Sequence, residues 1–132
     1  MDHKLARPPK APLHLLPAAA LEAAASAFFD GACKYEPWNW GPSHGTREEI
    51  ETYAASAMRH LLAFTDPTRA DYDAESGLHH VAHAIAATMI VAAKLGLEYQ
   101  TPRSYPGGDG APSGTLPTWH DSETNTPQLP RR

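Results

Sequence analysis

Several features that mark common classes of protein are missing from this sequence. Its only cysteine, Cys33, has no partner within the chain, so the fold cannot depend on internal disulfides. The first residues lack the apolar run of a signal peptide, and no uncharged apolar stretch is long enough to span a bilayer. The 11 basic residues are scattered and the formal net charge is −4, which argues against binding of a nucleic-acid backbone. We therefore expect a cytoplasmic protein with neither a membrane nor polymeric nucleic acid as a partner.

Strand patterns are also absent, because no stretch alternates between apolar and polar residues for long enough. Helical periodicity is present instead. The first predicted helix begins near Pro17, whose ring is preset for a first turn, and continues until Gly31 permits a turn. The second has Thr46 as its N-cap, with Glu49 three residues later in a capping box, and should end before the Asp-Pro pair at 66–67. These patterns predict an all-α fold.

The third predicted helix carries the residues that most suggest chemistry. It should start between Asp73 and Ser76, both of which are suitable N-caps, and run to about Lys94, with Gly96 as the terminating residue. Beyond His83 it is apolar almost all the way round, and such a helix is normally buried. The imidazoles at its entrance are therefore expected to point into the protein interior.

Proline and glycine gather at both ends of the chain and divide it into three parts. We expect an irregular arm over 1–15, a helical domain over 16–100 and an irregular Pro/Gly-rich tail over 101–132. A core this short buries only about 60–65% of its unfolded surface, so association with further copies would complete the burial. The expected architecture is a compact helical bundle completed by homo-oligomerisation.

His80 and His83 can both reach one point beside the third helix, because residues three apart are neighbours on a helix surface. Imidazole together with the carboxylates of Asp73 and Glu75 suits divalent first-row ions, and Mn²⁺ or Mg²⁺ with a phosphate ester in the open positions. The alternative for these residues is a structural role, as polar groups bonded to the backbone at a helix entrance.

The second helix adds a polar stripe along the flank of its apolar face, formed by Glu49, Tyr53, Ser56 and His60. Arg59 offers a positive group for phosphate oxygens, although an exposed arginine more often pairs with a surface carboxylate. Between the first two helices, an ammonium, three aromatic rings and an amide suggest nucleotide binding, or alternatively a loop that covers a small core; these residues are Lys34, Tyr35, Trp38, Asn39 and Trp40.

Three motifs in this order carry a family resemblance over roughly residues 15–95. They are Gly31-Ala32-x-Lys34-Tyr35-x-x-x-Asn39-Trp40, then Arg59-His60-Leu61, then Asp73-x-Glu75-Ser76-Gly77-Leu78-x-His80-x-Ala82-His83-Ala84. The chain resembles the phage dATP/dGTP diphosphohydrolase family, relatives of the MazG-type all-α nucleotide pyrophosphohydrolases.

The resemblance implies a MazG-like helical enzyme, a homodimer or homotetramer, that uses two or more Mg²⁺ or Mn²⁺ ions. Such an enzyme converts a deoxynucleoside triphosphate, here dGTP with dATP as a further candidate, to the monophosphate and pyrophosphate. In phages that replace adenine with 2-aminoadenine, members of this kind supply dGMP, and the compartment would then be the host cytoplasm.

The wider MazG pattern places Glu-x-x-Glu on one helix and Glu-x-x-Asp on the next, whereas this chain has His80-x-x-His83 at the second place. Glu48 and Glu51 have the first spacing but are expected to face solvent. The residues expected to bind metal are Glu75, His80, His83, Asp73 and His60, with Glu49, Glu36 and His79 ranked behind them. Catalysis is assigned to Glu75, His60 and His83, and substrate binding to Lys34, Tyr35, Trp38, Asn39, Trp40 and Arg59.

Two other functions are compatible with the same residues. One is a different metal-dependent phosphohydrolase, which would release orthophosphate or tripolyphosphate instead of pyrophosphate. The other is a non-enzymatic helical interaction protein whose histidines are structural; it would show no thermal stabilisation by any nucleotide.

Overall fold

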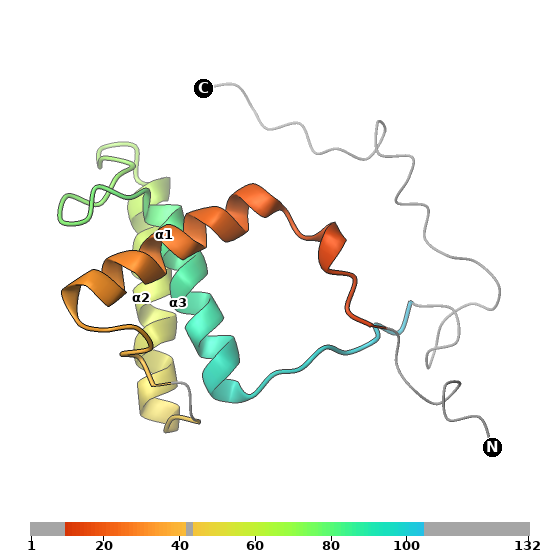
Figure 1. Ribbon diagram of the computed structural model, residues 1–132. Helices are drawn as coiled ribbons and strands as arrows, with labels where there is room; N and C mark the ends of the chain where they lie inside the picture. The colour runs from red at the N-terminus through yellow and green to blue at the C-terminus, as the bar shows by residue number, and fades with distance from the viewer. Residues whose placement is uncertain (1–9, 42–43, 105–132) are drawn as a thin grey trace, which may run out of the picture. The chain divides into compact units, whose positions relative to one another are not determined.

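The computed structural model describes residues 10–41 and 44–104, and all of its longer elements are helices (Figure 1). They are α1 (Ala18–Lys34), α2 (Arg47–Thr65) and α3 (His80–Leu95), preceded by a single 3₁₀ turn, η2 (Leu13–Leu15). No strand occurs among the described residues, where the nearest approach is an isolated bridge between Tyr72 and His79. The predicted all-α class is confirmed.

The chain divides into two compact units, and the helices found among the described residues all belong to Pro12–Glu98. In the other unit, the described residues 10–11 and 99–104 contain neither helix nor strand. The expectation of an irregular arm over 1–15 and an irregular tail over 101–132 falls mainly on residues 1–9 and 105–132, which lie outside the described part of the chain. No helix of the described residues is both long and apolar enough to cross a membrane.

Helix α1 extends three residues beyond the predicted stop at Gly31. The Gly31 carbonyl accepts a hydrogen bond from the backbone N–H of Tyr35, so the glycine lies inside the last turn. A glycine in a helix interior costs only about 1 kcal/mol, which the rest of the helix can offset. Pro37 is the better explanation for the end, because a proline disfavours helical geometry at the residue before it.

Helix α2 has the predicted ends. The Thr46 hydroxyl accepts a hydrogen bond from the backbone N–H of Glu49 at 3.2 Å, which caps the first turn. At the other end Asp66 leaves helical geometry immediately before Pro67. The cap and the proline therefore define this helix as the sequence indicated.

Helix α3 starts at His80, so the prediction of a start between Asp73 and Ser76 was wrong. The reason is Gly77, whose φ of +74° lies in the left-handed region and cannot belong to a right-handed helix. The Asp73 carboxylate instead accepts a hydrogen bond from the backbone N–H of Ser76 at 2.9 Å and closes a local turn. The predicted C-terminus at Gly96, with φ +69°, is confirmed.

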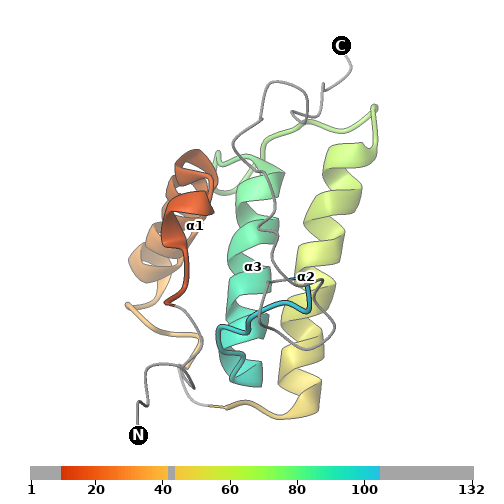
Figure 2. The same cartoon turned by 90° about the vertical axis from the view of Figure 1, so that its right-hand side faces the viewer.

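Helix α3 lies between the other two helices (Figure 2), and it contacts both of them. Among the described residues no large side chain is fully buried, and the buried apolar residues are almost all alanines: Ala24, Ala27, Ala57, Ala63, Ala82, Ala84, Ala86 and Ala87, together with Ile50. Small side chains let the helix backbones approach closely. The polar residues His80 and Lys94 are buried as well.

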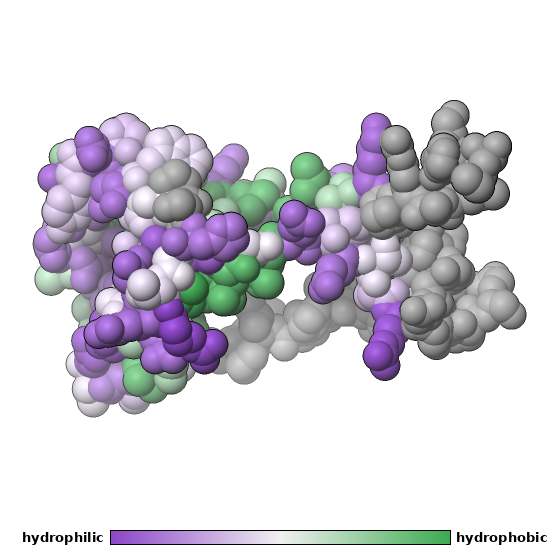
Figure 3. Space-filling model, turned by 90° about the horizontal axis from the view of Figure 1, so that it is seen from below, coloured by the Kyte–Doolittle hydropathy of each residue, from purple (hydrophilic) through white to green (hydrophobic). Residues whose placement is uncertain are grey.

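Apolar side chains remain exposed on the outer faces of α2 and α3. Met58, Leu61 and Leu62 of α2 and Met89 of α3 are each between 42% and 63% exposed. The space-filling view shows hydrophobic residues gathered on one face of the molecule among hydrophilic ones (Figure 3). The exposure of Leu61, at the helical spacing of the buried Ile50 and Ala57, indicates that the three helices do not cover the whole apolar face of α2 by themselves.

Candidate metal centre

Two histidines and one carboxylate come together where α2, α3 and the connection between them meet. His60 belongs to α2, His80 is the first residue of α3, and Asp73 lies in the turn that precedes α3. Each can present one ligand atom such that the three atoms lie within 4.8 Å of one another. The Nδ1 atoms of the two imidazoles are 3.0 Å apart. This separation is a hydrogen-bond distance, in which one ring nitrogen donates and the other accepts.

His83 stands next to this group but makes a different contact. Its ring stacks on the His60 ring, with 4.7 Å between centroids and 17° between planes. Its Nε2 lies 2.7 Å from the Ser76 hydroxyl, which also accepts a hydrogen bond from the Leu78 backbone N–H. Ser76 therefore fixes the orientation of the His83 ring.

The electrostatics of the cluster favour the forms that bind metal. Burial lowers the pKa of His60 below its ordinary value, and the nearby His83 and His80 lower it further. The backbone N–H of Ser76 lowers the pKa of Asp73 by stabilising the carboxylate. A neutral imidazole beside an ionised carboxylate is the protonation state that a divalent cation requires. The donor set of His60, Asp73 and His80 therefore fits a metal ion in both charge and geometry.

Glu75, predicted as a ligand, lies apart from the clustered ligand atoms. Its side chain is 77% exposed, and its Oε1 is 2.9 Å from the Lys34 ammonium. Lys34 also pairs with Asp30 at 3.2 Å, and these two carboxylates raise the pKa of the ammonium. Lys34 and Glu75 are therefore paired with each other. The sequence had suggested a phosphate as the partner of Lys34 and a metal ion as the partner of Glu75.

The lower-ranked candidates have other positions. The His79 ring lies 5.3 Å from the rings of both Phe64 and Tyr72, and its Nδ1 caps α3 by accepting a hydrogen bond from the Val81 backbone N–H. Glu49 is 3.6 Å from the Lys94 ammonium, at the far end of α2. Glu36 is exposed at the surface, and so is Arg59, which was assigned to substrate binding. Glu48 and Glu51 are exposed as well, in agreement with the expectation that they face solvent.

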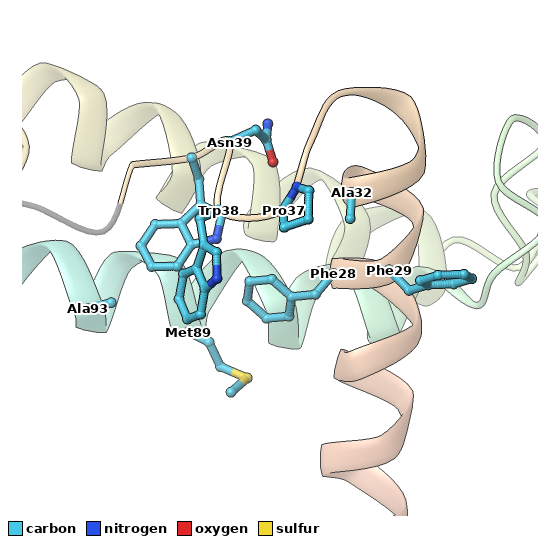
Figure 4. Close-up of a pocket in the computed structure, with 9 residues that line it drawn as sticks. Phe28, Phe29, Ala32, Pro37, Trp38, Asn39, Met89 and Ala93 are labelled. Atoms are coloured by element: carbon cyan, nitrogen blue, oxygen red, sulfur yellow. The ribbon is translucent and has the colours of Figure 1, made fainter.

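The loop after α1 forms one wall of an aromatic cavity of about 500 Å³. Trp38, Asn39 and Trp40 line it from the loop, and the centroids of the two indole rings are 5.6 Å apart. In Figure 4 the Phe28 ring of α1 points toward Trp38, whereas Phe29 points away. Tyr35 and Lys34 do not line this cavity, and Tyr35 is 73% exposed.

A second cavity of about 180 Å³ connects the loop with the histidines. Its walls include His60 and His83 together with Asn39 and Trp40. Since Phe28, Asn39 and Trp40 line both cavities, the aromatic space and the histidine cluster are neighbours.

Sequence reasoning missed Ser76, Phe28 and Met89 as residues of these sites. Ser76 was interpreted as a possible helix cap, whereas it bonds to His83, and Phe28 lines both cavities. The one available signal was the position of Ser76 inside the acid- and histidine-rich segment.

The chain was compared with known proteins and families. A family model described as dATP/dGTP diphosphohydrolase, N-terminal, matches residues 4–101. This range contains all three helices, the clustered histidines and the aromatic loop. No curated protein and no solved structure matches the chain. The match covers most of the sequence, and the chain therefore belongs to the dATP/dGTP diphosphohydrolase family, through the N-terminal region that defines it.

Proposed function

We propose that this protein is a metal-dependent hydrolase of purine deoxynucleoside triphosphates. It cuts dGTP, and dATP as a second substrate, between the α and β phosphates, and it releases the monophosphate and pyrophosphate. The observation that carries the proposal is the convergence of His60, Asp73 and His80, whose ligand atoms lie within 4.8 Å of one another. Membership of a family named for dATP and dGTP supports the substrate class.

The donor chemistry favours manganese over magnesium as the resident ion. Two imidazole nitrogens and one carboxylate oxygen suit first-row transition ions, whereas Mg²⁺ takes oxygen ligands. When bound, the ion would neutralise charge on the triphosphate and lower the pKa of water beside the α phosphorus. A second ion would need a further carboxylate, and Glu75 could supply it only by leaving Lys34.

His83 is assigned the role of proton acceptor for the attacking water. Its Nε2 is occupied by Ser76 at 2.7 Å, and that contact holds the ring parallel to His60. In the tautomer whose Nε2–H donates to the Ser76 hydroxyl, Nδ1 is the ring nitrogen that would accept the proton from water. Ser76 would act through His83 and would not touch the substrate.

The aromatic cavity is assigned to the deoxynucleoside. Trp38 and Trp40 supply flat surfaces for stacking on a base, and Asn39 supplies an amide that can bond to a base edge. The cavity that His60 and His83 share with Asn39 and Trp40 then leads from the base toward the phosphates. Lys34 and Arg59 would stabilise phosphate charge, and Lys34 must exchange Glu75 and Asp30 for the substrate to do so.

The test is pyrophosphate release from dGTP and dATP in the presence of Mn²⁺. Asp73→Asn keeps an oxygen that can accept the Ser76 N–H bond but removes the charge from the ligand set. We expect turnover and Mn²⁺ affinity to fall at least about tenfold while the protein stays folded. Asp66→Asn is the matched control, because that carboxylate bonds only to the nearby Thr68 in the described structure.

Three outcomes would overturn the assignment. Orthophosphate or tripolyphosphate as the product would identify a different phosphohydrolase. Equal turnover in the Asp73 and Asp66 variants would remove the metal centre from the reaction. A melting temperature that no nucleotide raises, with or without Mn²⁺, would favour an interaction protein.

We also propose that a second copy of the chain covers the outer face of α2 and α3. A groove of about 370 Å³ runs along this face between Leu61 and the apolar residues Val81, Ile85 and Met89. Homo-oligomers usually bury such exposed apolar surfaces. Leu61→Glu places a charge in this groove and should lower the mass measured by light scattering to that of a monomer, and an unchanged mass would place the interface elsewhere.

A further inference from the structure

Lys94 is an unusual lysine because its side chain is only 4% exposed. It stands in the last turn of α3, where a lysine that merely complements the helix dipole could remain in water. Lysine is almost never fully buried unless its charge is paired. The groups that contact its ammonium should therefore explain why this lysine is buried.

The Lys94 ammonium joins three parts of the helical unit. It donates a hydrogen bond to the Gly41 carbonyl at 3.2 Å and lies 3.6 Å from the Glu49 carboxylate in the first turn of α2. It also lies 5.8 Å from the centre of the Tyr53 ring, on whose face a cation is attracted. Of these contacts, the bond to Gly41 is the one that reaches the aromatic loop.

The loop from Tyr35 to Gly41 makes its other described backbone hydrogen bonds locally. Asn39 donates to Glu36, Gly41 donates to Trp38, and Tyr35 donates to the end of α1. The Lys94 bond is thus the hydrogen bond, among the described residues, that ties the loop to α3. The Lys94 bond holds the loop at Gly41, the residue whose backbone N–H closes the last turn of the loop.

Trp38 makes such a tie necessary. Its φ of +63° lies in the left-handed region, which a bulky L-residue adopts only when the surroundings enforce it. The Trp38 side chain is 67% exposed, so packing around it supplies little of that constraint. The hydrogen bond from Gly41 to Trp38 closes the turn, and the bond from Lys94 fixes Gly41.

We propose that Lys94 is a positioning residue for nucleoside binding. It keeps the loop in the conformation that aligns Trp38, Asn39 and Trp40 along the aromatic cavity, and it does not touch the substrate. This inference rests on the proposed function, in which those three residues hold the deoxynucleoside. It predicts that loss of the ammonium weakens substrate binding and leaves the histidine cluster intact.

The experiment compares Lys94→Met, which keeps the aliphatic stem, with Lys94→Arg, which keeps a donor, and with Lys10→Met at an exposed lysine as the control. For Mn²⁺-dependent pyrophosphate release from dGTP, we expect Lys94→Met to raise KM roughly tenfold, as for the loss of one hydrogen bond from a charged group. Its kcat and its Mn²⁺ affinity should match the wild-type values, and Lys94→Arg should restore KM. If the methionine variant does not fold, Lys94→Gln replaces it.

A folded Lys94→Met protein with unchanged KM would overturn the proposal, and so would a parallel loss of kcat, Mn²⁺ affinity and melting temperature. If the wild-type protein releases no pyrophosphate, the proposed function fails, and tryptophan fluorescence decides the role of Lys94 separately. With Trp119→Phe in the background, Lys94→Met should increase acrylamide quenching of Trp38 and Trp40. Unchanged quenching would show that the loop does not need Lys94.

Discussion

Replacement of Gly77 by alanine isolates the backbone requirement of the turn that presents Asp73. Gly77 has a φ of +74°, and a Cβ added there would meet nothing within 4 Å. The cost of Gly77→Ala therefore comes from the backbone and not from a steric clash with neighbours. Left-handed geometry costs an L-residue about 1–2 kcal/mol.

Part of this cost is offset in the unfolded chain. Alanine has fewer unfolded conformations than glycine, which is worth about 0.4–1 kcal/mol where the native geometry suits it. The net destabilisation expected for Gly77→Ala is about 1 kcal/mol. For a domain of this size, that corresponds to a melting temperature lower by roughly 4–8 °C.

The same substitution should weaken metal binding. The Gly77 N–H donates to the Asp73 carbonyl at 2.8 Å, and the Asp73 N–H donates to the Leu78 carbonyl at 2.7 Å, so a change of geometry at Gly77 moves Asp73 as well. We expect lower Mn²⁺ affinity, measured by isothermal titration at a temperature where the wild type and the variant are both folded.

Gly77→Asn is the matched control, because asparagine tolerates left-handed geometry better than alanine does. It should melt between the wild type and Gly77→Ala in a circular dichroism scan. If Gly77→Ala melts with the wild type and binds Mn²⁺ equally well, the turn does not position Asp73. Our explanation for the late start of α3 would then be wrong.

Two further predictions concern stability. Burial lowers the pKa of His60 in the folded protein below its ordinary value of 6.5. Between these two pKa values the unfolded chain binds more protons than the folded protein, so a lower pH favours unfolding. The contribution of His60 to the stability of the metal-free protein should therefore be fully present above pH 6.5 and be lost as the pH falls through the folded-state pKa. Urea unfolding across this range should show a steeper pH dependence for the wild type than for His60→Gln, and equal slopes would contradict the assignment. Thr46→Ala removes the hydroxyl that caps α2 and should cost about 1 kcal/mol in urea unfolding, with no change in Mn²⁺ affinity because the cap and His60 lie near opposite ends of the helix.

Helix ends were predicted best where the capping side chain and the helical pattern of the sequence indicated the same residue as the boundary. At Thr46 the hydroxyl cap and the following helical pattern coincide, and the structure has the helix there. Before α3 the same reasoning failed, because Asp73 and Ser76 are good caps in a helix and equally good partners in a local turn. The left-handed glycine at 77 decided between them, and its conformation is a property of the folded chain.

The candidate site divides in a similar way. Helical spacing placed His80 and His83 at the entrance of the third helix, and the family motif placed His60 with them. The pairing of Glu75 with Lys34 joins residues that are far apart in the sequence, so no local pattern could indicate it. The same holds for Lys94, which the sequence indicated only as the approximate end of the third helix and whose contacts with Gly41 and Glu49 join distant parts of the sequence.

Because the interior contains few large side chains, the packing of the helices depends on the same histidines as the proposed chemistry. Where an ordinary bundle would place leucine between its helices, this one places alanine, and the imidazoles of His60, His80 and His83 occupy the space that remains. A substitution at any of the three would alter the packing of α2 against α3 as well as the proposed metal centre. Under the proposed function, substitution of Asp73 or Ser76 is therefore the change that should reduce activity with the smallest effect on the bundle, because the turn can change without opening a void between the helices.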